Sequence, residues 1–191
     1  MEPIAVVGLG NPGTEYGQMR HNVGFQVLDT LSGRWKKGFK PGKGEYYFVR
    51  AAIGDREVIL VKPLTFMNNS GEAVAEVIDR FSLPFSSLLV VADDFALPLG
   101  VLRLRPSGSD GGHNGLSSII YQLQSDQFPR LRCGIGRAEM PPPSAMADFV
   151  LSAFEPEEQA SVRSMVGRAA DAVTHFVSAG IESAMNVFNR Q

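Results

Sequence analysis

The segment IAVVGLG (residues 4–10) decides the fold of this 191-residue chain. A short, continuous apolar run that ends in glycines is typical of a strand buried on both faces of a sheet. The segment LLVVADD (residues 88–94) has the same pattern and ends in two carboxylates. Strands of this kind belong to sheets that helices cover on both sides, so the two segments predict an α/β fold.

Strand and helix patterns alternate along the rest of the chain. Apolar residues at helical spacing predict helices at residues 23–35, 74–81, 116–123 and 156–180. Further strands are expected at residues 45–53, 57–64, 100–106 and 130–136. Gly54-Asp55 is a hairpin signal, so the strands on either side of it should pair antiparallel. We expect one domain over residues 1–191, an α/β fold with a mixed β-sheet flanked by helices.

Two further segments carry local predictions. Asn69, followed three residues later by Glu72, predicts a capping box at a helix start. The segment AEMPPPSAMA (residues 138–147) predicts a proline-rich loop, which could cover a bound substrate or serve only as a linker.

The charge balance and the cysteine count exclude several classes of protein. The 18 Lys and Arg against 20 Asp and Glu give a net charge of -2, which argues against nonspecific coating of nucleic acid but permits a local basic patch. Cys133 has no disulfide partner within the chain, so we expect a small buried side chain. No run approaches the roughly 20 apolar residues of a membrane span, and no basic region precedes an apolar run at the N-terminus. We therefore expect a cytoplasmic protein.

Polar segments follow four of the predicted strands. They are NPGTEYGQMRHN (residues 11–22), TFMNNSG (residues 65–71), ADDFALP (residues 92–98) and SGSDGGHNG (residues 107–115). In open α/β sheets, ligands bind beyond the carboxyl ends of the strands. These segments are therefore expected to converge on one site.

His21 is the first candidate for catalysis. A neutral imidazole, with an ordinary pKa of about 6.5, can accept a proton from water, and a carboxylate commonly holds its tautomer. Asp93 or Asp94 could supply that carboxylate. His113 is a rival base, and either histidine could instead serve a structural role in a cap or in packing.

Amides form the second candidate group. Five asparagines lie in the polar segments: Asn11, Asn22, Asn68, Asn69 and Asn114. An amide offers a donor and an acceptor together, which suits a peptide group or a water molecule, although a single asparagine is more typical of a turn or cap. The backbone amides near Gly112 could bind an anion, because a glycine-rich loop there opens a helix.

Arginines alternate along two predicted strands. Arg103 and Arg105 share one face of the first, and Arg130 and Arg132 share one face of the second. They could clamp a phosphate or form a solvated outer face.

Other site types lack their usual spacing. The chain has no CxxC or HExxH motif, so no metal centre is expected, and no GxSxG elbow for a serine nucleophile. GLGNPG (residues 8–13) fits the dinucleotide fingerprint, but Pro12 interrupts it and Asp29 falls within a predicted helix rather than after a strand. The glycines are better explained as a turn that presents Asn11.

Five segments, in this order, resemble bacterial-type peptidyl-tRNA hydrolase: VVGLGNPGTEYGQMRHNVGF, KPLTFMNNSG, VVADDFALPLG, GSDGGHNGLSSI and FPRLRCGIGR. They run from the N-terminus to about Arg137, with a weaker likeness in DFVLSAF and the last helix. The chain departs from the family pattern at Met19, where Thr is common, and at Ala96, where Asp is common. Neither position carries a proposed catalytic group.

The resemblance implies hydrolysis of the ester between a peptide and the terminal ribose of tRNA, which frees tRNA from stalled or aborted translation. It implies His21 as general base for water, with Asp93 orienting it. The substrate-binding residues that it implies are Asn11, Tyr16, Met67, Asn68 and Asn114, and the tRNA phosphate-binding residues are Arg103, Arg105 and Arg132. Asn68, Asn114 or the amides near Gly112 should stabilise the oxyanion.

The resemblance also implies peptidyl-tRNA as the partner, no membrane, no metal or other cofactor, and a monomer. An RNA-binding protein without catalytic activity is the alternative within the same family.

Overall fold

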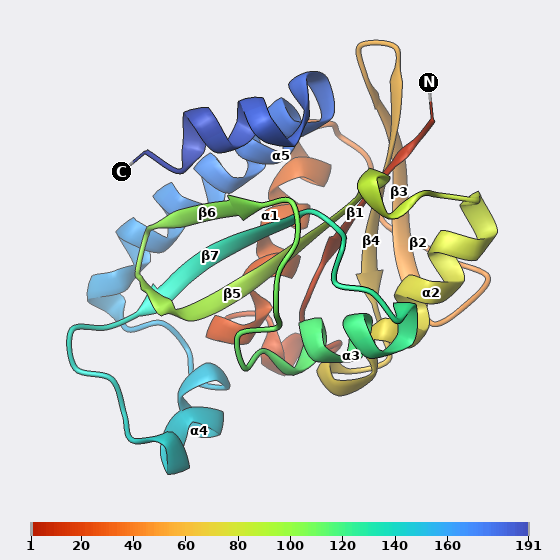
Figure 1. The fold of residues 1–191 in the computed structure, drawn as a ribbon. Coiled ribbons are helices and arrows are strands. Elements are labelled where there is room, and N and C mark those ends of the chain that lie inside the picture. The colour runs from red at the N-terminus through yellow and green to blue at the C-terminus, as the bar shows by residue number, and fades with distance from the viewer. Residues whose placement is uncertain (1, 191) are drawn as a thin grey trace.

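A seven-stranded sheet in the order β2-β3-β4-β1-β5-β7-β6 forms the centre of the computed structural model, which describes residues 2–190 (Figure 1). The strands are β1 (Ile4–Gly8), β2 (Lys40–Pro41), β3 (Tyr46–Ile53), β4 (Arg56–Pro63), β5 (Leu88–Pro98), β6 (Leu102–Arg105) and β7 (Arg130–Gly136). β1, β4, β5 and β7 are parallel, whereas β2, β3 and β6 pair antiparallel with their neighbours. The predicted mixed sheet and the hairpin at Gly54-Asp55 are confirmed.

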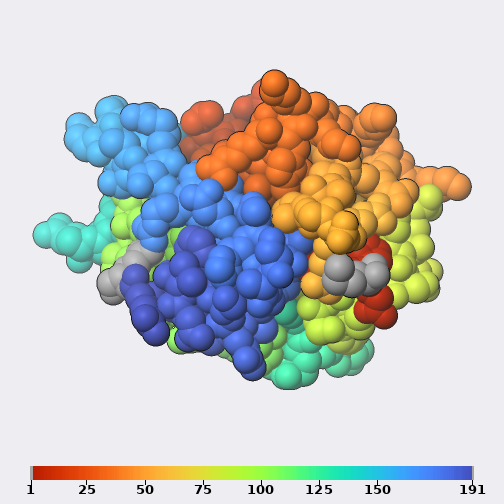
Figure 2. All heavy atoms as spheres, turned by 90° about the horizontal axis from the view of Figure 1, so that it is seen from above, coloured from red at the N-terminus to blue at the C-terminus, as the bar shows by residue number. Residues whose placement is uncertain are grey.

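Helices cover both faces of the sheet. They are α1 (Val23–Arg34), α2 (Ser70–Phe81), α3 (Asn114–Leu123), α4 (Met146–Val150) and α5 (Gln159–Phe188). One apolar core joins α1 and α5 to the sheet, and a second joins α2 and α3 to its other face. Figure 2 shows α5, in blue, spread over the face seen from above, beside the orange segment that follows α1.

β1 contributes to both cores, as its sequence predicts. Val6 belongs to the core under α1 and α5, whereas Ala5 and Val7 belong to the core under α2 and α3. All three side chains are fully buried. Because side chains alternate across a strand, a strand between two helix layers must be apolar at every position.

Three local predictions are wrong. Asn69 precedes α2, but its side chain makes no cap hydrogen bond, because the 3₁₀ turn η3 (Met67–Asn69) leads directly into the helix. The proline-rich segment is not all loop, since Pro143 begins the 3₁₀ turn η5 (Pro143–Ala145), which continues into α4. The last helix does not end at Gly180: that residue has a φ of 80° and breaks the helix, which then resumes as far as Phe188.

Cys133 is fully buried in β7, as expected for a small apolar side chain. Burial raises the pKa of its thiol, with a smaller contribution from Asp93, so the sulfur stays protonated. Among the helices of residues 2–190, none has both the length and the apolar character needed to cross a bilayer.

Gly24 marks a close approach of α1 to the sheet. A Cβ at Gly24 would lie 2.4 Å from the Leu9 nitrogen and 2.5 Å from the Val91 oxygen. Gly24→Ala is therefore expected to lower the free energy of unfolding by about 1–3 kcal/mol or more, measured by urea denaturation. Gly33→Ala in the same helix is the control, because no atom lies within 4 Å of its Cβ position, and it should stabilise the protein by up to about 1 kcal/mol. Equal losses in the two variants would contradict this packing.

Candidate active site

The polar segments that follow β1, β4 and β5 lie beside one another at the carboxyl ends of these parallel strands, as predicted. The fourth segment follows β6, which is antiparallel, and reaches the same place through His113 and Asn114. These segments form a cleft of about 370 Å³. The cleft is lined by Asn11, His21, Phe66, Met67, Asn68, Asn114, Ala147, Val150 and Leu151.

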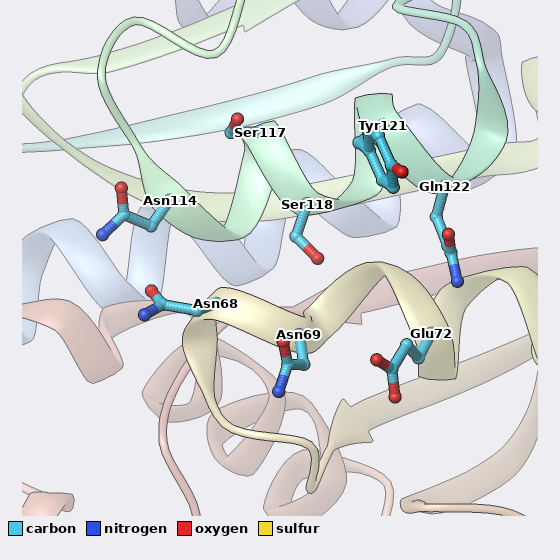
Figure 3. A pocket seen from close by; sticks show the side chains of 8 residues that line it. All are labelled: Asn68, Asn69, Glu72, Asn114, Ser117, Ser118, Tyr121 and Gln122. Atoms are coloured by element: carbon cyan, nitrogen blue, oxygen red, sulfur yellow. The ribbon is translucent and has the colours of Figure 1, made fainter.

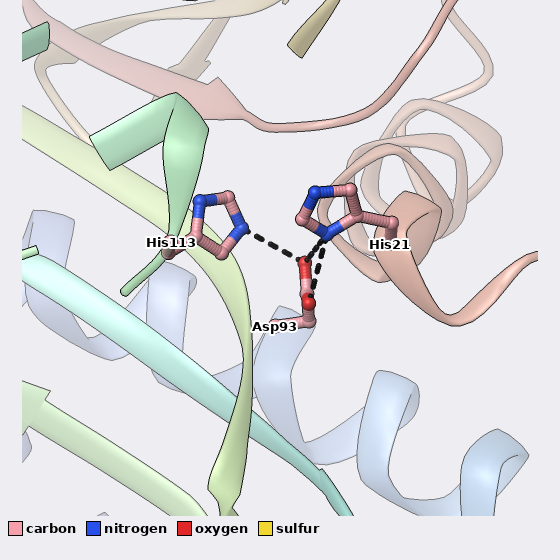
Figure 4. Close-up of side chains that lie close together, drawn as sticks. All are labelled: His21, Asp93 and His113. Atoms are coloured by element: carbon pink, nitrogen blue, oxygen red, sulfur yellow. Dashed lines mark hydrogen bonds and ion pairs between the residues drawn. The ribbon is translucent and has the colours of Figure 1, made fainter. Parts of the chain in front are cut away.

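Asp93 lies at the end of the buried part of β5 and binds two histidines (Figure 4). Its Oδ1 is 2.9 Å from His21 Nδ1 and 2.9 Å from His113 Nε2, and its Oδ2 is also 2.9 Å from His21 Nδ1. The Asp93 residue is only 3% exposed. Of the two candidate carboxylates, Asp93 therefore holds His21, whereas Asp94 accepts from the Ala96 nitrogen and from Arg132.

The hydrogen bonds of His113 assign its tautomer. His113 is the N-cap of α3, and its Nδ1 accepts from the backbone nitrogens of Gly115 (3.1 Å) and Leu116 (3.3 Å). A ring nitrogen that accepts carries no proton, so the proton of neutral His113 is on Nε2 and is donated to Asp93. His113 thus has no free lone pair, which removes it as the rival base.

His21 has the opposite arrangement. Its Nδ1 donates to Asp93, so the lone pair of the neutral ring is on Nε2. Nε2 makes no hydrogen bond within residues 2–190. The side-chain polar atom of these residues that is both buried and unpartnered is Thr65 Oγ1, so Nε2 of His21 is not a buried atom. The unpartnered Nε2 is therefore open to the cleft, where a water molecule could reach it.

The charge of Asp93 is maintained by its two partners. Burial alone would raise the pKa of this carboxyl. The positive charge that His113 and His21 carry when protonated, together with the hydrogen bonds from both rings, lowers it further than burial raises it. The net result is a pKa well below the ordinary range, so the carboxylate stays ionised when His21 takes up a proton.

Asn11 is held in place by Asn22. The Asn11 nitrogen donates to Asn22 Oδ1 at 3.0 Å, and Asn22 Nδ2 donates to the Asn11 oxygen at 2.9 Å. The Asn11 Oδ1 accepts from the Met67 nitrogen at 2.8 Å. Asn22 is therefore structural, and the Asn11 side chain keeps its Nδ2 donor for the cleft.

The remaining predicted residues divide between two neighbouring spaces. Met67, Asn68 and Asn114 line the cleft with His21, as expected. Asn69 lines an adjoining groove instead. Tyr16 lies in the 3₁₀ turn η1 (Thr14–Tyr16) and does not line the cleft, so its contact with substrate stays a prediction.

Two backbone amides of the glycine-rich loop already have acceptors, so the Gly112 amide itself is not free to bind a ligand. The Gly112 nitrogen donates to Asp110 Oδ1 at 2.7 Å, and the His113 nitrogen donates to the Asp110 oxygen. His113 Nδ1 accepts from the nitrogens of Gly115 and Leu116, the second and third residues of α3. These contacts do not involve the Asn114 nitrogen, so the role of that amide stays a prediction.

Sequence reasoning missed how Arg20 supports the site. Its buried guanidinium donates to both carboxylate oxygens of Glu158 and to Ser152 Oγ, and it lies over the rings of Phe149 and Phe154. These contacts fasten the segment that includes α4 to the turn that carries His21. Leu151, directly after α4, then lines the cleft.

The predicted phosphate-binding arginines lie on β6 and β7. Arg103 and Arg105 are exposed and alternate with the buried Leu102 and Leu104. Arg103 is paired across the strands with Arg132, whose NH1 nitrogen is 3.3 Å from Asp94 Oδ2.

Arg130 does not belong to this group. It is 1% exposed and donates to the backbone oxygens of Ser109, Asp126 and Phe128, so it is structural.

One cluster within residues 2–190 has the composition of a metal site: His21, Asp93 and His113 offer ligand atoms within 4.8 Å of one another. Two nitrogens and a carboxylate suit a transition metal. The two ring nitrogens that face Asp93, Nδ1 of His21 and Nε2 of His113, carry protons in the hydrogen-bond pattern above. A metal ion could bind there only after both protons were lost.

Comparisons with known proteins agree on one family. The family model described as peptidyl-tRNA hydrolase matches residues 5–191. A peptidyl-tRNA hydrolase of Chlorobaculum parvum is 44% identical over 185 residues and covers 97% of each chain. One of Geobacillus thermodenitrificans is 46% identical over 183 residues, covering 96% of this chain and 97% of the relative. The crystal structure of peptidyl-tRNA hydrolase from Acinetobacter baumannii has a TM-score of 0.92 at 32% identity, covering 99% of this chain and 95% of that one.

Glu158 links the stability of the site to pH. Burial raises the pKa of its carboxyl, but hydrogen bonds from Arg20 and Arg137 lower it more, from 4.5 to about 2. A lowered pKa stabilises the folded protein above pH 4.5, and this contribution is lost as the pH falls towards 2. Glu158→Gln should therefore lower the free energy of unfolding by up to about 3 kcal/mol at pH 7 and flatten its fall below pH 4.5.

Urea denaturation across this pH range checks the expectation. The control is Glu157→Gln, which removes the same charge from the exposed neighbouring residue. If both variants followed the pH dependence of the unsubstituted protein, the Arg20–Glu158 pair would not stabilise the site.

Proposed function

This chain belongs to the peptidyl-tRNA hydrolase family, and from that premise we propose that it cleaves the ester between a peptide and tRNA with water activated by His21. The observation that carries the proposal is the accessible Nε2 of His21, whose other ring nitrogen is held by Asp93. An ester to a ribose hydroxyl has a better leaving group than an amide, so an activated water can suffice without a covalent nucleophile.

In the first step, Nε2 of His21 takes a proton from water while the water oxygen bonds to the ester carbonyl carbon. The ionised Asp93 stabilises the imidazolium that forms. In the second step, the carbonyl re-forms, the bond to the ribose oxygen breaks, and the imidazolium returns its proton to that oxygen. General base catalysis of this kind contributes about 10²–10⁴-fold.

Amide donors around His21 would stabilise the oxyanion and hold the peptide. Asn11 has its Oδ1 occupied by the Met67 nitrogen, so its Nδ2 is available to donate to a peptide carbonyl. Asn68 and Asn114 line the same cleft, and we assign the oxyanion to their side-chain amides. A donor at this position contributes about 10²–10³-fold. Met67 supplies an apolar wall for the peptide.

The tRNA phosphate would bind at Arg103, Arg105 and Arg132. The exposed positions of Arg103 and Arg105, and the cross-strand pairing of Arg103 with Arg132, support this assignment. These arginines give a net acidic protein a local basic patch, which is enough to bind a phosphate without coating nucleic acid.

His21→Ala is expected to lower the single-turnover rate of N-acetyl-aminoacyl-tRNA cleavage by about 10²–10⁴-fold, because the general base is lost. Binding of tRNA should be retained. His175→Ala is the control, since His175 lies on α5 and binds Ser183. A His21→Ala variant with near-normal cleavage, together with a His113→Ala variant that loses it, would overturn the assignment of the base.

Replacing both Arg103 and Arg105 by Ala should weaken tRNA binding and reduce its dependence on salt. The slope of log K against log salt should fall by about one unit for each lost phosphate contact. Arg50→Ala is the control, because Arg50 is an exposed arginine on β3, towards the opposite edge of the sheet. A slope unchanged by the double substitution would assign Arg103 and Arg105 to a solvated face.

A further inference from the structure

A groove between α2 and α3 adjoins the cleft that contains His21 (Figure 3). It encloses about 530 Å³ and is lined by Asn68, Asn69, Glu72, Asn114, Ser117, Ser118, Tyr121 and Gln122. Asn68 and Asn114 line both spaces, so the groove begins where the cleft ends. Nothing in the reaction described above uses the other lining residues.

The width of the groove is fixed by close contact between its two helices. The Gly71 nitrogen donates to the side-chain Oγ of Ser118 at 3.0 Å. A Cβ at Gly71 would lie only 2.2 Å from the backbone oxygen of Ser118. The floor of the groove is therefore packed, and its shape exists before any ligand binds.

The lining suits a peptide better than a nucleic acid. Apart from Glu72 and Tyr121, the side chains are amides and hydroxyls, which can donate to and accept from the backbone groups of an extended peptide. No Lys or Arg lines the groove, and its one charged residue is acidic, so a phosphate strand would be repelled. Tyr121 is 75% exposed and offers an apolar surface to a ligand side chain.

The groove has room for a short peptide segment. Along α3, the rise from Asn114 to Tyr121 is about 10 Å, which matches about three residues of extended chain. Glu72 on α2 lies four residues after Asn68, which belongs to the preceding 3₁₀ turn η3. This separation is about 6–8 Å along the axis and so about two extended residues. Its carboxylate forms no salt bridge with any residue from 2 to 190.

We propose that this groove binds the part of the substrate peptide that is amino-terminal to the esterified residue, and this proposal rests on the proposed hydrolase function. Glu72 selects peptides with basic side chains. The peptide runs from Asn68 and Asn114 along the crossing of α2 and α3. The tRNA phosphate lies on the other side of His113, at the arginines of β6 and β7. The exposed carboxylate of Glu72 favours Lys or Arg in the peptide and disfavours Asp or Glu.

The test compares two tetrapeptidyl-tRNAs, with Lys or with Glu at the second and third residues from the ester. We expect the unsubstituted protein to have a higher kcat/KM for the Lys substrate. Glu72→Gln should lower the Lys-to-Glu ratio of kcat/KM by about two- to fivefold, the range of an exposed ion pair, and Glu72→Lys should invert the preference. Asp79→Asn, which removes the same charge from α2 outside the groove, should keep the original ratio.

A second readout separates this proposal from the proposed function. Binding of the same two peptides, joined to adenosine through an amide, can be measured without cleavage. The unsubstituted protein should show the same preference for the Lys peptide, and Glu72→Gln should reduce that preference as it does in cleavage. A ratio unchanged in both Glu72 variants, in cleavage and in binding, would overturn the peptide groove. If Glu72→Lys instead tightened binding of deacylated tRNA without altering the ratio, the groove would be assigned to RNA. Absence of cleavage with the binding preference intact would overturn the hydrolase function alone.

Discussion

The carboxylate of Asp93, buried between two imidazole N–H groups, is the constraint on which the rest of the site depends. A buried negative charge is costly unless donors satisfy it, and His21 and His113 supply two. His113 can donate only because its other nitrogen caps α3, and His21 is presented by a turn fastened through Arg20 to Glu158. Asp93 thus binds one nitrogen of each ring, and because the cap of α3 uses the other nitrogen of His113, His21 is the histidine that keeps a free lone pair.

Around this centre the molecule separates different chemistries in space. Neutral amides surround the reactive nitrogen, where they can stabilise developing charge without adding any of their own. Arginines lie on β6 and β7, towards one edge of the sheet, and the polar groove with Glu72 lies between α2 and α3. A substrate that joins an RNA to a peptide would find a suitable surface on each side of its ester.

The sequence predicted the parts of this arrangement that depend on local pattern. The apolar segment at residues 4–10 predicts a central strand because strands covered on both faces must be apolar throughout. The role of His113 could not be predicted, because it depends on a cap whose acceptor is the ring itself. Likewise, the sequence alone does not distinguish Asp93 from Asp94, because both are aspartates near the end of the same predicted strand. Their side chains point to opposite faces of β5, and this difference decides which of them meets His21. The sequence also could not show that the Gly112 amide is occupied, because its acceptor is the side chain of Asp110 in the same loop.

The proton positions on the histidine rings are the property to measure. With three histidines in the chain, long-range ¹H–¹⁵N correlation NMR can resolve each ring nitrogen. In the neutral rings, the arrangement around Asp93 predicts a proton on Nδ1 of His21 and on Nε2 of His113. A proton on Nε2 of His21 would leave no base facing the cleft and would contradict the proposed activation of water.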